Sequence, residues 1–170
     1  MGKIFLITAL LTLSLFAITP VFAQEKDVFN SSGLPMPRFV SLRSDKVFVR
    51  TGPALRYPIK WVFQRKNLPV EVIQEFDTWR KIRDHEGQEG WIHQSLTQGR
   101  RFALVDTGKD MLTLMRKADE ASKPVALLEP EVIVKLEECL ETFCQVSVDG
   151  FKGWAERKLL YGIYENEKLD

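Results

Sequence analysis

The sequence predicts an all-β protein made of two small, related β-units. Short runs rich in β-branched and aromatic residues alternate with turn residues from position 38 onward. After residue 37, no window is long and apolar enough to predict a helix that covers a core. The second half of the chain also repeats the spacing of glycine and aromatic residues of the first half. Close strand spacing of this kind favours a small barrel or sandwich in each half.

Residues 1–23 have the layout of a secretory signal peptide. Lys3 provides a positive start, Ile4–Leu15 is almost wholly apolar, and Val21–Ala23 places small residues before Gln24. The apolar run is short for a membrane span, which needs about 20 residues. We expect cleavage before Gln24, export to the periplasm or the extracellular space, and no membrane span in the mature protein. An uncleaved membrane anchor is the alternative.

Residues 24–37 are polar and are broken by Gly33, Pro35 and Pro37, which predicts a flexible leader. We expect the first β-unit at 38–105, a linker near the sequence DTGKD, and the second β-unit at 109–164. The β-type runs of the first unit are 39–42, 47–49, 68–76, 79–84 and 89–94, with a turn at Gly87 between the last two. Residues 116–128 have some helical character, but Pro124 interrupts it.

The internal repeat aligns the run from Pro69 with the run from Glu131. Trp79 falls opposite Phe143, and Ile82 falls opposite Val146. Gly90-Trp91 falls opposite Gly153-Trp154, and upstream Arg50 through Pro58 matches Arg116 through Pro124 at the same spacing. Since both units need a core, we expect Trp91 and Trp154 to be core residues.

The two cysteines, Cys139 and Cys144, are separated by four residues. In an exported protein such a pair favours a disulfide across a tight turn, with two free thiols as the alternative. A zinc site is disfavoured because no second pair of cysteine or histidine residues lies nearby, and the sequence gives no set of ligands for any other metal or cofactor. The 24 basic and 23 acidic residues nearly cancel, so the sequence lacks the charge of a nucleic-acid binder.

The stretch 77–96 concentrates polar side chains and raises the question of catalysis. His93 and Ser95 are two residues apart on an expected strand, so they share a face. No glycine-rich elbow frames Ser95, and the second unit has Glu156 and Lys158 at the matching positions. A hydrolase needs three groups in register. We therefore expect no catalytic residues and a non-enzymatic protein.

The run 47–96 resembles the bacterial SH3-like domain, SH3b, as found in exported proteobacterial proteins that often carry it in tandem. The resemblance rests on the Val49–Pro53 motif (VRTGP), the Val70–Val72 strand, the Trp79–Ile82 motif and the Gly87–Ile92 hairpin. It implies two tandem small SH3-like barrels. The second unit keeps the Gly-Trp hairpin but has Lys117–Asp119 where the family has Thr-Gly-Pro.

Strand alternation gives a hypothesis for the ligand site. If Ile82 points into the barrel, Trp79 lies on the outward face with Lys81 and Arg83. The resemblance supports this, because eukaryotic relatives use a tryptophan at the start of this strand to hold extended peptides. Tyr57 and Trp61 extend the aromatic surface, and arginines line it. The ligand-binding residues predicted in this way are Trp79, Tyr57, Trp61, Arg50 and Arg83.

The resemblance implies a non-catalytic envelope protein that binds peptidoglycan, through its peptide or glycan, or an envelope protein. The alternative is a structural or adaptor protein in which Trp79, Tyr57 and Trp61 form the interface between the units and with a protein partner. Tandem small barrels need such an interface.

Overall fold

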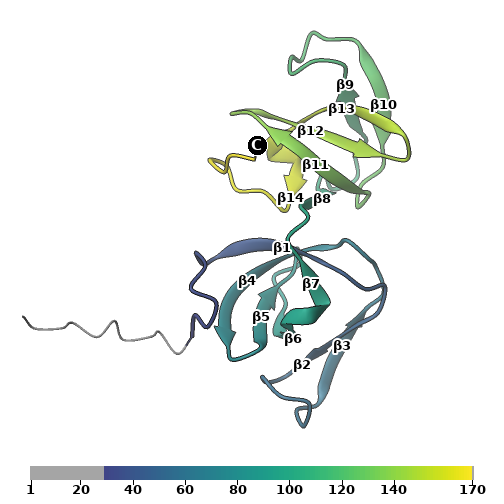
Figure 1. Ribbon diagram of the computed structural model, residues 1–170. Coiled ribbons are helices and arrows are strands. Elements are labelled where there is room, and N and C mark those ends of the chain that lie inside the picture. The colour runs from purple at the N-terminus through teal and green to yellow at the C-terminus, as the bar shows by residue number, and fades with distance from the viewer. Residues whose placement is uncertain (1–28, 170) are drawn as a thin grey trace, which may run out of the picture.

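The computed structural model describes residues 29–169, so the predicted signal peptide and residues 24–28 lie outside the described part. Two seven-stranded antiparallel sheets make up the fold (Figure 1), which confirms the predicted all-β class and the tandem SH3-like barrels. The strands of the first unit are β1 (Arg38–Leu42), β2 (Val47–Arg50), β3 (Ile59–Phe63), β4 (Pro69–Phe76), β5 (Trp79–Arg83), β6 (Glu89–His93) and β7 (Thr97–Gln98). Those of the second unit are β8 (Phe102–Val105), β9 (Leu112–Met115), β10 (Pro124–Leu128), β11 (Ile133–Cys139), β12 (Phe143–Val148), β13 (Phe151–Glu156) and β14 (Leu160–Tyr161).

The two units have the same strand topology. The first sheet runs β3-β2-β6-β5-β4-β1-β7, and the second runs β10-β9-β13-β12-β11-β8-β14. In each unit a short 3₁₀ turn precedes the last strand: η1 (Gln94–Leu96) in the first and η2 (Arg157–Leu159) in the second. Within residues 29–169, no helix is long and apolar enough to cross a membrane.

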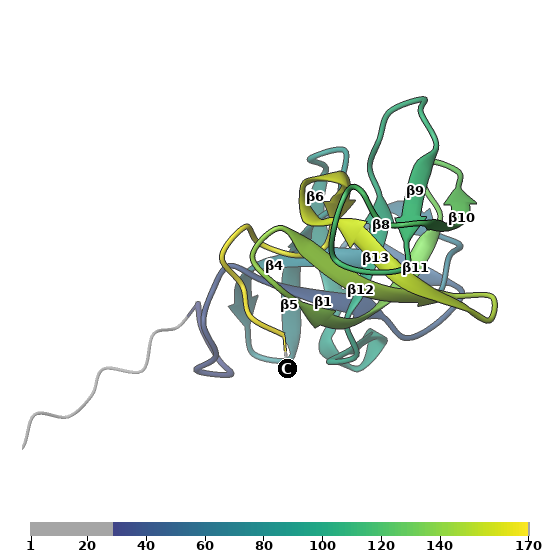
Figure 2. The ribbon, with the colours of Figure 1, turned by 90° about the horizontal axis from the view of Figure 1, so that it is seen from above.

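The boundary between the units lies earlier than the sequence predicted. β8 pairs with β11 and β14, so residues 102–105 belong to the second unit and not to the first. The sequence DTGKD, predicted to be the linker, is instead the turn between β8 and β9, where Thr107 Oγ1 donates to the carbonyl of Asp110 at 2.5 Å. The actual connection is residues 99–101, between β7 and β8 (Figure 1). Seen from above, the second unit overlies the first (Figure 2).

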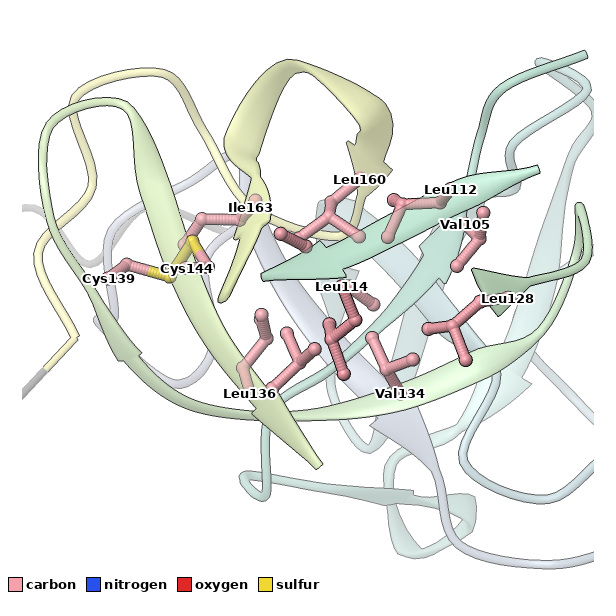
Figure 3. Packing of buried hydrophobic residues seen from close by; sticks show 13 residues of the cluster. Val105, Leu112, Leu114, Leu128, Val134, Leu136, Cys139, Cys144, Leu160 and Ile163 are labelled. Carbon is pink, nitrogen blue, oxygen red and sulfur yellow. A yellow bond between two sulfur atoms is a disulfide. The ribbon is translucent and has the colours of Figure 1, made fainter. Parts of the chain in front are cut away.

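Each unit encloses its own apolar core. Alternate residues of β2, β4 and β6 point inward in the first unit, and Val49, Val70 and Ile92 are fully buried. The second core, shown in Figure 3, is built in the same way around Leu114, Val134 and other branched side chains. The disulfide between Cys139 and Cys144 lies at one margin of this core, which confirms the predicted pairing.

The glycine of each Gly-Trp hairpin is required by a close strand crossing. A Cβ atom on Gly90 would lie 2.4 Å from Val49 Cγ1, and one on Gly153 would lie 2.7 Å from the carbonyl oxygen of Met115. β2 and β9 therefore press directly on these glycines. Because side chains alternate along a strand, the tryptophan after each glycine must face away from the core.

The register confirms most of the predicted repeat and corrects one part of it. Gly90 pairs with Ile82, and Gly153 pairs with Val146, as the alignment requires. However, Arg50 pairs with Trp91, whereas Met115, and not Arg116, pairs with Trp154. Arg50 therefore corresponds to Met115, and the predicted match of Arg50 with Arg116 is wrong by one residue.

Residues 29–37 are attached to the first unit, so the prediction of a flexible leader is wrong for this part of 24–37. The Glu75 amide donates to the carbonyl of Phe29 at 2.8 Å, and the Ser32 amide donates to Glu75 Oε2 at 2.9 Å. Met36 packs against the core of the first unit. The polar composition of the leader hid these contacts, because they are mostly backbone hydrogen bonds that any sequence can make.

The two units are joined by an aromatic interface. The Phe39 ring lies 5.2 Å from the Tyr161 ring and 4.7 Å from the Tyr164 ring. The Tyr164 hydroxyl donates to Glu71 Oε1 at 2.7 Å. Leu104 of the second unit is buried in the core of the first. These contacts fix one barrel against the other.

Candidate binding face

A row of five cross-strand neighbours crosses the outer face of the first unit. Ile59 of β3 pairs with Arg50, Arg50 pairs with Trp91, Trp91 pairs with Lys81, and Lys81 pairs with Gln74. We call this set, Ile59, Arg50, Trp91, Lys81 and Gln74, the Trp91 row. Adjacent strands are about 4.8 Å apart, so the row spans about 19 Å.

The indole of Trp91 lies between two cations in this row. Trp91 is half-buried and is not part of the core cluster, so the prediction that it is a core residue is wrong, and the same holds for Trp154. The guanidinium of Arg50 donates from Nη1 to the carbonyl of Tyr57 at 2.8 Å. Lys81 Nζ lies 2.6 Å from Glu89 Oε2, which lowers the pKa of Glu89 and keeps its carboxylate ionised. The arrangement offers an apolar surface with the guanidinium of Arg50 on one side and the Lys81–Glu89 ion pair on the other.

The loop between β2 and β3 extends the apolar part of this face. The Tyr57 ring packs on Gly52, where an added Cβ would lie 2.7 Å from it, so the glycine of the VRTGP motif makes room for the ring. Leu55 is 76 % exposed and Ile59 is 47 % exposed. An exposed apolar group of this kind next to a half-buried tryptophan often marks a contact site.

Trp79 is not on this exposed surface. It is only 8 % exposed, so the expectation that its ring lies partly outside is wrong. Strand alternation gave its side of the sheet but not what covers it. The His93 ring packs edge-on against it with 5.6 Å between ring centroids, and the Gln94 amide bonds to the carbonyl of Thr78 at 2.8 Å, which folds η1 back beside it.

The other predicted ligand-binding residues do not all lie on one surface. Trp61 is half-buried against the core, opposite Val49, and its indole nitrogen has no hydrogen-bond partner. Arg83 binds Glu71 with Nε and Nη2 at 2.9 and 2.6 Å, and Glu71 also accepts from Tyr164 at the unit interface. The structure therefore brings Arg50 and Tyr57 together and leaves Trp79, Trp61 and Arg83 out of the Trp91 row.

The interface between the units uses other aromatics than the sequence predicted. Phe39, Tyr161 and Tyr164 form it, and Trp79, Tyr57 and Trp61 take no part in the ring contacts there. Burial raises the pKa of the Tyr164 hydroxyl, and its hydrogen bond to Glu71 raises it further. Tyr161 and Tyr164 were missed because they lie beyond the aligned part of the repeat, although two tyrosines three residues apart are a visible signal.

His93 and Ser95 do lie together, as their spacing predicted. Ser95 Oγ is 2.8 Å from His93 Nδ1, and the Ser95 amide donates to the same nitrogen at 3.3 Å. In the described residues no carboxylate bonds to the imidazole, which packs against Trp79 instead. Glu156 and Lys158 form a 2.6 Å ion pair at the matching place in the second unit. His93 therefore caps the 3₁₀ turn η1, whereas Glu156 makes no side-chain capping bond at η2. Within residues 29–169 a third group for nucleophilic catalysis is missing.

The second unit carries the same row with different chemistry. Trp154 pairs with Met115 and Gln145, Met115 pairs with Pro124, and Gln145 pairs with Glu138. Both cations of the first unit are thus replaced by uncharged side chains, and the row ends in a carboxylate. Over residues 29–169, no group of three or more histidine, cysteine or acidic side chains is arranged to hold a metal ion.

Comparison with known proteins gives a family and a fold. The sequence model of a family described as bacterial SH3 domain matches residues 43–99 and 108–162. Two solved structures from Trichomonas vaginalis are similar: NlpC2, at 11 % identity and a TM-score of 0.36, and NlpC1, at 12 % and 0.34. The matches cover 79 % of this chain for NlpC2 and 78 % for NlpC1. The chain spans about half the length of those two proteins, 51 % of NlpC2 and 48 % of NlpC1. No curated protein matches the chain.

Proposed function

Because the chain belongs to the bacterial SH3 domain family, which matches it twice, we propose that it is a non-catalytic binding module of the cell envelope. In this proposal the protein is exported, and the Trp91 row of the first unit binds peptidoglycan. The observation that carries the proposal is the half-buried Trp91 between Arg50 and Lys81.

The chemistry of the row suits that polymer. An indole surface packs on sugar rings and on the aliphatic parts of a peptide, and cations beside it attract carboxylates. Peptidoglycan stem peptides carry carboxylates along an extended chain. The row, at about 19 Å, is long enough for several sugar or amino-acid units. No ion pair of Arg50 is present among residues 29–169, so its charge is open to a ligand.

A co-sedimentation experiment with purified sacculi tests the proposal. The protein beginning at Gln24 is mixed with sacculi, and Trp91→Ala is compared with Trp154→Ala, which removes the same side chain from the row without cations. Trp91→Ala is expected to weaken binding by about 2 kcal/mol, a loss typical of a central aromatic contact. Equal binding of both variants and the unchanged protein would contradict the assignment of the Trp91 row.

The second candidate is an adaptor that binds an envelope protein, and the aromatic interface between the units favours it. Phe39, Tyr161 and Tyr164 hold the two barrels in one orientation, as a scaffold for a protein partner requires. Failure of the unchanged protein to sediment with sacculi would favour this candidate over wall binding.

A further inference from the structure

An apolar groove of about 500 Å³ lies along one side of the second unit. β10 forms one wall, and Met111, Val148 and Phe151 lie along the groove as well. Three of its large apolar side chains are strongly exposed: Met111 at 49 %, Leu127 at 62 % and Phe151 at 52 %. Exposed apolar side chains gathered along one groove are typical of an interaction site and are costly as bare surface.

One residue that lines the groove is much smaller than its counterpart in the first unit. Trp61 faces Val49 across β3 and β2, and Ala126 faces Leu114 at the corresponding place across β10 and β9. In the first unit the Trp61 ring covers the hairpin glycine, since an added Cβ on Gly90 would lie 3.1 Å from its Cη2 atom. In the second unit Leu114 takes this role, since an added Cβ on Gly153 would lie 2.7 Å from its Cγ atom. Ala126, in place of a tryptophan, lines the groove and leaves it open on that side.

The strand beside the groove is a free sheet edge after the proline and the register shift at its start. β10 is the last strand of its sheet, and within the described residues it pairs only with β9. Its residues after Pro124 are Val-Ala-Leu-Leu and carry no charge. The edge strand of the first unit, β3, instead contains Lys60, whose ammonium donates to the carbonyl of Glu89 at 2.9 Å. Lysine on an edge strand hinders pairing with another chain, and an apolar edge without it is a template for such pairing.

We propose that β10 and this groove bind an extended segment of a partner protein. The segment adds as a strand to the free edge of β10 and places a large apolar side chain in the groove beside Ala126. The charged residues that line the groove, Glu129 and Asp149, are both acidic. A basic residue beside the apolar one therefore gives charge complementarity, and the partner segment is apolar and basic. This site is separate from the Trp91 row and does not depend on wall binding.

A synthetic peptide tests the proposal directly. The probe is an acetylated, amidated peptide of sequence KTVFVTK, with DTVFVTD as the charge-reversed control, and binding is measured by calorimetry on the protein beginning at Gln24. Leu127→Lys is the main variant, because this exposed side chain can be replaced without loss of core packing. Val62→Lys is the matched control, since Val62 pairs with Phe48 as Leu127 pairs with Thr113.

The proposal expects binding of KTVFVTK that falls at least about tenfold for Leu127→Lys and for DTVFVTD and stays unchanged for Val62→Lys. Ala126→Trp places the residue of the first unit in the lining of the groove. Because the larger ring narrows the groove, this variant is expected to abolish binding while the thermal transition is retained. Absence of binding to the unchanged protein, or equal binding by Leu127→Lys, would overturn the proposal. So would a concentration-dependent dimer that Leu127→Lys dissociates, because the occupant would then be a second copy of the chain.

Discussion

The two units fasten the same hairpin by different means. Glu75 pairs with Arg80 between β4 and β5, and Cys139 pairs with Cys144 at the corresponding place between β11 and β12. In the first unit the Glu75 carboxylate, 2 % exposed, accepts from Arg38, Arg80 and the Ser32 amide. In the second unit a disulfide occupies that place. The fold thus requires a strong cross-strand link at this position but not a particular chemistry.

A second comparison concerns the aromatic positions. Trp79 and Phe143 begin β5 and β12, and both are buried, at 8 % and 7 % exposed. Trp91 and Trp154 are half-buried on the outer faces of both units. Both units therefore need the aromatic residue at the Trp79/Phe143 position for packing. At the Trp91/Trp154 position the two units differ in the charge of the neighbouring residues.

The largest expected effect comes from the buried aromatic position. Trp79→Ala and Phe143→Ala are each expected to lower the free energy of unfolding by about 3 kcal/mol or more, as large truncations in a core do. Trp91→Ala and Trp154→Ala should cost much less, because both side chains are only half-buried. Urea unfolding of the four variants measures this, and a larger loss for Trp91→Ala than for Trp79→Ala would reverse the assignment.

The ion cluster of the first unit is expected to have the next largest effect. Glu75→Gln leaves the guanidinium groups of Arg38 and Arg80 without their carboxylate, and breaking a buried pair in this way costs about 3 kcal/mol. Glu138→Gln, at an exposed position next to Cys139, is the control and should change stability little. Similar losses for both variants would show that the cluster is not the link.

The same carboxylate gives the first unit a dependence on acid. Burial by itself would raise the pKa of Glu75, but hydrogen bonds from Ser32 and Arg38 and the charge of Arg38 outweigh it and lower the pKa from 4.5 to about 2. Since the folded-state pKa is lowered, this stabilisation is present above pH 4.5 and is lost as the pH falls toward 2. Hydrogen exchange should show weaker protection of β4 and β5 at about pH 3 than at about pH 5. Glu75→Gln should remove this difference between the two pH values.

Loss of the disulfide is expected to destabilise the second unit by a smaller amount. Replacement of both Cys139 and Cys144 by serine removes a short loop closure, which contributes about 2 kcal/mol. Hydrogen exchange measured strand by strand should show reduced protection in β11 and β12 and unchanged protection in β4 and β5. Peptide mapping without reductant on exported protein provides the direct check, and two alkylatable thiols there would contradict the pairing.

The interface between the units is expected to give the smallest effect. Tyr164→Phe removes the hydrogen bond to Glu71 and should cost about 1.5 kcal/mol, as bonds to charged groups do. Burial raises the pKa of Tyr164 above its usual 10.0, so the neutral hydroxyl is favoured in the fold. Its contribution is therefore complete below pH 10 and declines above it. The measurement is the difference in the free energy of unfolding between Tyr164→Phe and the parent at about pH 9 and at about pH 11. A difference that does not change between these two pH values would show that the interface bond is not formed in solution.

The sequence was sufficient for the class, the repeat and the disulfide, because these follow from local patterns: strand periodicity, glycine spacing and cysteine separation. It misplaced Trp79 and Trp91, because alternation tells which side of a sheet a residue is on but not what packs over that side. The cover on Trp79 comes from His93 and from η1, fourteen or more residues along the chain. The unit boundary was missed because β8 shows its membership only through pairing with β11 and β14.

The two limits of the described chain, residues 29 and 169, meet the two barrels at equivalent places. The carbonyl of Phe29 accepts from the Glu75 amide at 2.8 Å, and the carbonyl of Leu169 accepts from the Cys139 amide at 3.2 Å. A pull on residues 29 and 169 therefore acts first on these two amides. Next to Phe29 the following contacts are the ionic contacts of Glu75, which separate one after another. Next to Leu169 the ion pair of Arg101 with Glu167 separates in the same way, but the disulfide still joins β11 to β12. Under tension the first barrel is expected to unravel before the second, so the protein has a built-in order of mechanical failure.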